Sequence, residues 1–254
     1  MDYVMAYGYI FLVGITLGSF YNVVGFRIPQ GQSIIKPRSA CGTCKQTLSP
    51  LELIPILSYL IQKGTCRQCG SKISAFYPVI ECLTGILFCL TLWLVGWSGE
   101  ALIVLALVSL FMIIIVSDLT YMIIPDKVLV FFATLLFIGR LVIPLQPWWD
   151  SILGAVVGFS VLLLIAFVSR GGMGGGDIKL FAVIGLVLGT RGVLIAFFLS
   201  CLLGAVIGIG LKLVGKVGAG KPIPFGPFIA MGSLWAYFYG ESLLRMYLQM
   251  FSQR

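Results

Sequence analysis

The chain lacks histidine altogether and carries little charge. Of its 254 residues, none is histidine and only 10% are charged. The first absence excludes Ser-His and Cys-His catalysis, and it also excludes catalytic metal centres built on imidazole ligands. The second absence excludes an ordinary soluble domain, in which about a quarter of the residues are charged.

Apolar residues are abundant instead. They make up 59% of the chain, the mean hydropathy is +1.08, and apolar runs recur along the whole length. Because about 20 apolar residues suffice to cross a bilayer, the sequence predicts an all-α polytopic membrane protein with about eight transmembrane helices. We expect the helices at 4–24, 76–97, 101–117, 128–146, 152–169, 178–190, 192–214 and 224–243.

Basic residues are distributed unevenly around these spans. If the polar segment between the first two spans is cytoplasmic, all 17 Lys and Arg residues lie inside except Arg140, Arg191, Arg245 and Arg254. The positive-inside rule therefore predicts that both termini face outward. Membrane topology accounts for the net charge of +8, so we expect no nucleic-acid partner. The segments expected in the cytoplasm are 27–75, 118–127, 170–179 and 215–223.

The chain is expected to have three parts. A first transmembrane helix occupies 1–26, a small polar module occupies 27–75, and a membrane-embedded domain with about seven helices occupies 76–254. The first residues lack the basic region and cleavage site of a signal peptide, so we expect the first helix to remain in the protein.

Two C-x2-C pairs lie in the polar module. "CGTC" spans Cys41 to Cys44, and "CRQC" spans Cys66 to Cys69. A glycine near each pair permits a tight turn, so four thiolates can surround one structural zinc ion that has no open position. A redox pair or two disulfides are the alternatives, although cytoplasmic thiols normally stay reduced. Core packing explains the other cysteines, which lie within spans: Cys82, Cys89 and Cys201.

Four of the nine acidic residues lie in or beside expected spans near the inner face: Glu81, Asp118, Asp126 and Asp177. Two spans separate Asp118 from Asp177, so the chain crosses the membrane and returns to the same face. Backbone-permissive residues accompany both, in "SDLTYMIIPD" and "GMGGGD". Two carboxylates at one depth can share a proton and act as general base and general acid, as in aspartic proteases.

Structural roles are the alternatives for these aspartates. Asp118 is alternatively a solvated acid at a helix end. Asp126, which follows Pro125, is alternatively the N-cap of the fourth span, and Asp177 the N-cap of the sixth.

Five segments in order resemble bacterial type IV prepilin peptidases, which are intramembrane aspartic proteases. The segments are "GSFYNVVGFRIP" (18–29), the cysteine pairs, "ISAFYPVIECLTG" (73–85), "SDLTYMIIPD" (117–126) and "GMGGGDIK" (172–179). The G-x-G-D motif of the family falls on residues 174–177. The resemblance implies that Asp118 and Asp177 are catalytic and that Asp126, the Asp of "IPD", is a supporting residue.

The resemblance also implies a substrate and a compartment. Family members remove the leader peptides of type IV prepilins or pseudopilins at the cytoplasmic face of the bacterial inner membrane, cutting after a Gly. Many members then methylate the new N-terminus with S-adenosylmethionine, and the N-terminal cytoplasmic module is implicated in that step. Other members are peptidases only, and the intact cysteine motif is compatible with both.

Two functions of other classes fit parts of the sequence. A transporter also combines broken helices with acidic residues, but its acids are expected at the midplane, and no inverted repeat is visible here. A zinc module tethered by inert spans would leave the paired acids and the glycine-rich breaks unexplained. We therefore expect a prepilin peptidase.

Overall fold

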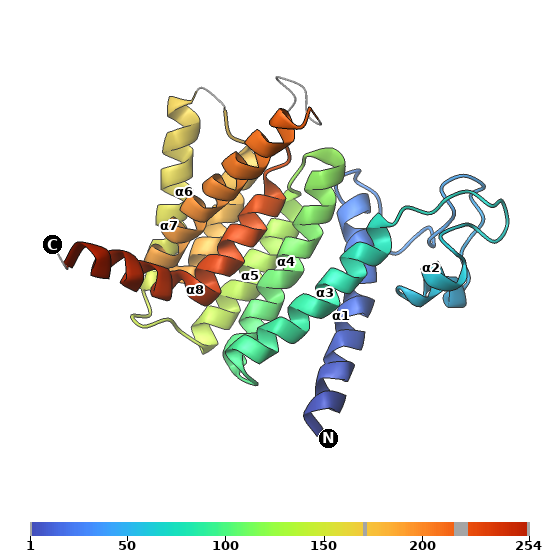
Figure 1. The fold of residues 1–254 in the computed structure, drawn as a ribbon, viewed down its shortest axis with the longest axis horizontal. Helices are drawn as coiled ribbons and strands as arrows, with labels where there is room; N and C mark the ends of the chain where they lie inside the picture. Colours follow the sequence, from blue (N-terminus) through green and yellow to red (C-terminus); the bar gives the residue numbers. More distant parts are fainter. Residues whose placement is uncertain (1, 170–171, 216–222, 253–254) are drawn as a thin grey trace. The chain divides into compact units, whose positions relative to one another are not determined.

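The computed structural model describes residues 2–169, 172–215 and 223–252. Within these ranges the chain is helical and has no named strand (Figure 1). The charge count above included four cations outside these ranges: Arg170, Lys216, Lys221 and Arg254. The elements are α1 (Asp2–Arg27), the 3-10 helix η1 (Pro50–Leu53), α2 (Leu57–Ile61), α3 (Phe76–Val95), α4 (Gly99–Tyr121), α5 (Asp126–Val142), α6 (Asp150–Val168), α7 (Gly175–Leu213) and α8 (Gly226–Ser252).

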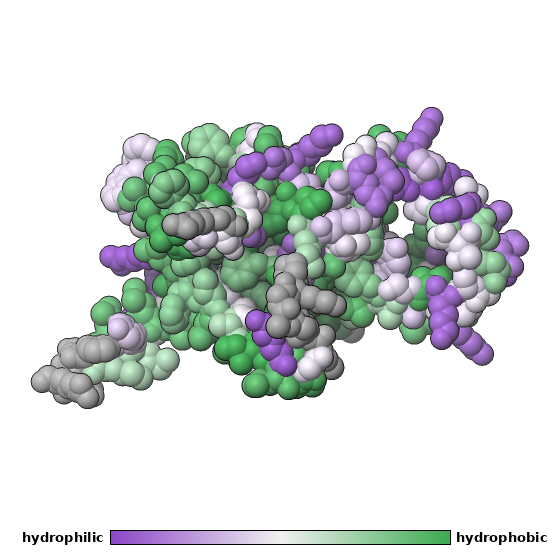
Figure 2. Space-filling view, turned by 90° about the horizontal axis from the view of Figure 1, so that it is seen from above, coloured by the Kyte–Doolittle hydropathy of each residue, from purple (hydrophilic) through white to green (hydrophobic). Residues whose placement is uncertain are grey.

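The all-α, polytopic class predicted from hydropathy is confirmed. Every predicted span overlaps a helix, and the two predicted at 178–190 and 192–214 join in α7. Five helices of the described chain are long and apolar enough to cross a membrane: α1, α3, α4, α6 and α7. Hydrophobic side chains cover much of the helices, while hydrophilic ones gather over the segment between α1 and α3 (Figure 2).

The chain divides into two compact units, Met1–Thr120 and Tyr121–Arg254. In the first unit, α1 and α3 pack closely because glycines face the contact. A β-carbon at Gly14 would lie 2.7 Å from the Cα of Gly85, and one at Gly18 would lie 2.8 Å from the Cα of Glu81. Such small residues let helix backbones approach each other in a membrane, where lipid removes the hydrophobic drive for association.

In the second unit, glycines likewise allow close packing of α6 against α7. Gly154 and Gly158 are one helical turn apart, and a β-carbon at either would collide with the α7 backbone at Gly185 or Phe181. Dispersion contacts along this close approach therefore replace the hydrophobic effect as the main source of helix association.

A kink divides α7 at Gly189, whose φ of 70° lies in the left-handed region. The polar groups released there have partners: Asp150 accepts the N–H of Thr190 at 3.2 Å, and Arg140 donates to the carbonyl of Val187 at 2.7 Å. The kink lies two residues before the gap at residue 191 between the predicted spans 178–190 and 192–214, because glycine adopts this φ without strain.

Candidate active site and metal centre

The two cysteine pairs adopt the same local fold. In each pair the first cysteine, Cys41 or Cys66, donates its N–H to the carbonyl five residues later at 2.9 Å. The residue four positions after that cysteine has a positive φ, Lys45 at 60° and Gly70 at 68°. Its N–H donates back to the cysteine carbonyl, which closes a tight turn around the pair. Each turn thus presents two sulfurs on one side.

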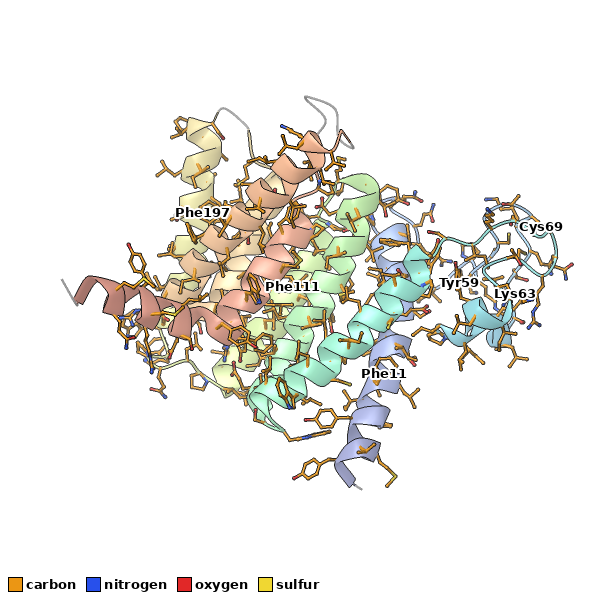
Figure 3. The ribbon with its side chains drawn as sticks, in the orientation of Figure 1. Phe11, Tyr59, Lys63, Cys69, Phe111 and Phe197 are labelled. Atoms are coloured by element: carbon orange, nitrogen blue, oxygen red, sulfur yellow. The ribbon has the colours of Figure 1, made fainter. Side chains whose placement is uncertain are left out.

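The four sulfur atoms converge on one centre. Those of Cys41, Cys44, Cys66 and Cys69 all lie within 4.8 Å of one another. The Cys41 and Cys69 sulfurs are 3.8 Å apart, and Cys69 lies in the segment between α1 and α3 (Figure 3). Zinc–sulfur bonds of about 2.3 Å in a tetrahedron give sulfur–sulfur edges of about 3.8 Å. The cluster is therefore able to hold a zinc ion through four thiolates.

Hydrogen bonds adjust the acidity of these thiols. The backbone N–H of Cys44 and then the Ser71 hydroxyl lower the pKa of Cys41 to about 5. The Ser71 hydroxyl also lowers the pKa of Cys69. The pKa of Cys44 moves the opposite way, to about 11; its backbone hydrogen bond with Gln46 opposes this rise, which desolvation and the neighbouring thiols cause. Hydrogen bonds and the neighbouring thiols thus separate the pKa values of Cys41, Cys44 and Cys69.

Asp118 lies in the last turn of α4, with 6% of its surface exposed. Its neighbour Ser117 is fully buried and donates to the carbonyl of Ile114 at 3.1 Å. The interpretation of Asp118 as a solvated acid is therefore wrong. A buried ionisable side chain in a membrane helix is a candidate for function because burial without a role is costly.

Asp177 occupies the third position of α7 instead of capping it. The helix begins at Gly175, with Gly174 as N-cap, and the N–H of Asp177 donates to the Gly174 carbonyl at 3.1 Å. The N-cap interpretation is therefore wrong. A carboxylate in this first turn is stabilised by the unpaired N–H groups and the dipole of the helix.

The glycines before Asp177 have distinct roles. A β-carbon at Gly174 would lie 3.0 Å from the Oδ2 atom of Asp177, and one at Gly176 would lie 2.8 Å from the Cβ of Ile124. A β-carbon at Gly175 would meet nothing within 4 Å. Gly176 is therefore the glycine that the geometry requires, because it admits the segment before α5, while Gly174 leaves room beside the Asp177 carboxylate.

Asp126 and Lys179 form an ion pair between α5 and α7. The Lys179 Nζ lies 2.8 Å from both carboxylate oxygens of Asp126. The Asp126 side chain is 64% exposed, and the Lys179 side chain is 52% exposed. Asp126 is the first residue of α5, whose N-cap is Pro125, so its prediction as an N-cap is also wrong. Its carboxylate instead links the start of α5 to Lys179 on α7, which lies two residues after Asp177.

Glu81 takes part in holding the polar module. Its Oε2 accepts the N–H of Ile56 at 2.8 Å, and only 7% of its surface is exposed. Ile56 precedes α2 and has a φ of 60°, which is strained for a branched residue. The carboxylate in α3 therefore stabilises an unfavourable turn in the module, a contact that sequence spacing does not reveal.

The predicted aspartates lie in different units. Asp118 ends α4 in the first unit, and Asp177 begins α7 in the second. The sequence also missed a buried amide, Asn22 on α1, which is 3% exposed. The available signal was a lone amide in an apolar run, "SFYNVV", because polar groups in spans are expensive and need partners.

Two family models match the chain. The bacterial peptidase A24 N-terminal domain matches residues 12–95, and the type IV leader peptidase family matches residues 105–209. The first match ends with α3, while the second includes Asp118, Asp126 and Asp177. No solved structure matches the chain.

Curated relatives match nearly end to end. The chain is 47% identical to the prepilin leader peptidase/N-methyltransferase of Bacillus subtilis (strain 168), over 95% of this chain and 97% of that one. It is 36% identical to the protein of the same name from Aeromonas salmonicida (strain A449), over 94% and 92%. The Pseudomonas aeruginosa protein of that name is 31% identical over the same shares. By these matches, and by the order of its cysteine and aspartate motifs, the chain belongs to the type IV leader peptidase family.

Proposed function

We propose that the chain is an intramembrane aspartic endopeptidase with Asp118 and Asp177 as its catalytic pair. It removes the leader peptides of type IV prepilins or pseudopilins after a Gly, at the cytoplasmic face of the bacterial inner membrane. The relatives named prepilin leader peptidase/N-methyltransferase support this substrate class. A transporter is the weaker interpretation because none of these relatives carries a transporter's name.

The setting of Asp177 carries the proposal. A side chain at Gly174 would crowd its carboxylate, and a side chain at Gly176 would displace the segment that leads into α5. The room beside the carboxylate supports the peptidase proposal, because that carboxylate must reach a water molecule and a peptide bond at the same time.

The chemistry needs only two carboxylates. The ionised one takes a proton from water, which attacks the carbonyl carbon of the scissile bond, and the protonated one gives its proton to the leaving amine. The substrate must be extended there, because the peptide bonds of a helix are hydrogen-bonded and shielded by side chains. The helix start at Gly175 contributes N–H groups and a favourable dipole for the ionised form of Asp177.

The module at 27–75 serves a second activity in this proposal. Cys41, Cys44, Cys66 and Cys69 would hold one zinc ion, which organises the module and leaves no open position for a substrate. S-adenosylmethionine would supply a methyl group, which the new N-terminal amine takes as it loses a proton and the sulfonium becomes a thioether. Residues 76–254 would form the peptidase domain, and both termini would face outward, as the positive-inside rule predicts.

The decisive experiment uses full-length protein in detergent or nanodiscs with a purified prepilin and S-adenosylmethionine. Mass spectrometry of the product reports leader loss and methyl transfer separately. We expect a cut after the Gly that precedes the hydrophobic helix. A prepilin that stays intact with well-folded protein would contradict the peptidase proposal, and a cleaved but unmethylated product would contradict the second activity alone.

A further inference from the structure

The segment between the two cysteine pairs exposes a contiguous set of apolar side chains. It consists of η1, α2 and the turn between them, and it is called the η1–α2 segment, residues 50–61. Six of its large apolar side chains are 39–69% exposed: Leu51, Leu53, Ile54, Leu57, Leu60 and Ile61. Single exposed apolar residues are ordinary, but a contiguous set marks a surface that another apolar phase or molecule covers.

The two faces of α2 are arranged in the reverse of the order usual for a water-soluble helix. Three polar residues of α2 and its C-cap line a cavity of about 450 Å³ shared with α1 and α3: Ser58, Tyr59 and Gln62. At about 100° per residue, the exposed residues of α2 fall on the opposite face. They are Leu57, Leu60 and Ile61. An apolar face that points outward is typical of a helix lying in the surface of a bilayer.

The start of α2 lies at the depth of a membrane span. The N–H of Ile56, just before α2, donates to Oε2 of Glu81 at 2.8 Å, and Glu81 is the sixth residue of α3. At about 1.5 Å per residue, Glu81 lies about 7–8 Å along the axis from the start of α3.

The length of α3 gives this position its meaning. The helix has 20 residues, and about 20 residues are needed to cross the hydrocarbon core of a bilayer. No part of α3 is therefore left over above the membrane, so Glu81 and its partner Ile56 lie at the level of lipid. Figure 3 shows the loop that carries Cys69 above α2, farther from this level.

Basic side chains accompany the segment. The module at 27–75 contains seven Lys or Arg residues and one acid, Glu52. That carboxylate accepts hydrogen bonds from the N–H and hydroxyl of Ser49, so it is engaged within the module. Lys63 is exposed and follows α2 almost directly (Figure 3). A lysine in this place keeps its alkyl chain beside apolar groups while its ammonium reaches a lipid phosphate.

We propose that the η1–α2 segment is immersed in the surface of an anionic phospholipid bilayer. Leu57, Leu60 and Ile61 contact acyl chains, and Lys63 contacts a headgroup phosphate. The bilayer is the occupant because the module is joined at both ends to candidate spans, α1 and α3, whose surrounding lipid reaches the depth of Ile56. This contact holds the cysteine module at the membrane, and it is independent of the proposed function.

Photo-crosslinking tests which face of α2 meets lipid. Benzoylphenylalanine is placed singly at Leu60, Ile61 or Gln62 of the full-length protein, in nanodiscs of equal parts phosphatidylcholine and phosphatidylglycerol. Intact-mass spectrometry identifies an adduct by the added mass of one phospholipid. The first two positions should give several times the lipid adduct of the third. Gln62 is the matched control because it is the next residue in the chain but lines the cavity.

Hydrogen exchange of residues 50–61 measures how firmly the segment is held. Leu60→Gln should raise the exchange rate by about tenfold, since burial of one leucine side chain contributes at least that factor. Lys63→Gln should raise it by about fivefold in the anionic nanodiscs, the contribution of one cation near an anionic surface, and little in pure phosphatidylcholine. Lys45→Gln is the charge control: its φ of 60° resembles the 51° of Lys63, but it lies in the first cysteine turn.

Three results would overturn the inference. Equal lipid adducts at all three positions would show that α2 has no lipid-facing side. In cell membranes with a co-expressed prepilin, an adduct with that protein or with a second copy of this chain, in place of lipid, would assign the surface to a protein partner. Unchanged exchange in a folded Leu60→Gln protein would show that the module alone holds the segment. Zinc content and thermal unfolding report folding, and Ile61→Gln replaces a variant that does not fold.

Discussion

The module at 27–75 and the α6–α7 pair differ in the interactions that hold them together. The module has short helices, exposed apolar side chains and no residues of η1 or α2 in its core, and its sulfur atoms converge on one point. The α6–α7 pair needs no such centre because glycines bring long backbones together. We expect a segment of this kind to depend on a bound metal ion for its fold, whereas packed membrane helices are stabilised along their whole length. The two regions should therefore fail separately.

The largest expected effect comes from the aspartates. Asp118→Asn and Asp177→Asn keep the size and much of the hydrogen bonding, but each removes the ionisable proton. Either should reduce leader cleavage by about 10²–10⁴-fold, the usual contribution of a positioned acid or base. Cleavage of a purified prepilin, followed by mass spectrometry, measures it.

Thermal unfolding and zinc content serve as folding controls for these variants. Substantial cleavage by a folded Asp118→Asn protein, together with an inactive Asp126→Asn protein, would transfer the catalytic role to Asp126.

Removing the metal should affect the module and spare the helices. Cys44→Ser, or a strong chelator, should remove about one zinc ion per chain and loosen residues 27–75, since structural zinc binding is coupled to folding. Methyl transfer should fall more than leader cleavage. Hydrogen exchange by mass spectrometry localises the change, with Cys201→Ser in α7 as the matched control.

Equal loss of protection in α6 and α7 would contradict the separation of the two regions. Native cysteines joined as disulfides would contradict the metal site itself.

The glycine motif offers a smaller and more local test. Gly176→Ala places a β-carbon against Ile124, whereas Gly175→Ala meets nothing within 4 Å. Displacing the start of α7 misplaces the Asp177 carboxylate, so Gly176→Ala should slow cleavage by about tenfold or more. Gly175→Ala should stay close to wild type. Similar rates for both variants would show that the clearance at Gly176 has no part in catalysis.

The smallest effect is expected from the Asp126–Lys179 pair. Both side chains are more than half exposed, and surface ion pairs are worth about 0–1 kcal/mol. Asp126→Asn should therefore lower cleavage by no more than about threefold, and high salt should produce a similar change in wild type. A much greater loss, measured at equal folding, would give Asp126 a direct role in the reaction.

Much of the fold could be predicted because the bilayer restricts the choices. A run of apolar residues long enough to cross has to be a helix, so hydropathy located every long helix within the described residues. The ends were less accurate: α4 continues to Tyr121, and α8 to Ser252, beyond the predicted spans. Helix ends depend on local capping and packing, and hydropathy measures neither.

The cysteine spacing alone predicted the convergence of four sulfurs, since C-x2-C turns are local and two of them suffice for a tetrahedron. The roles of the acids required the tertiary structure. Three contacts join segments that are distant in sequence: Asp126 pairs with Lys179, Glu81 accepts the N–H of Ile56, and Asn22 donates to the carbonyl of Tyr77. Hydropathy assigns each residue a cost in the membrane, but the partner that offsets this cost is chosen by how the helices pack.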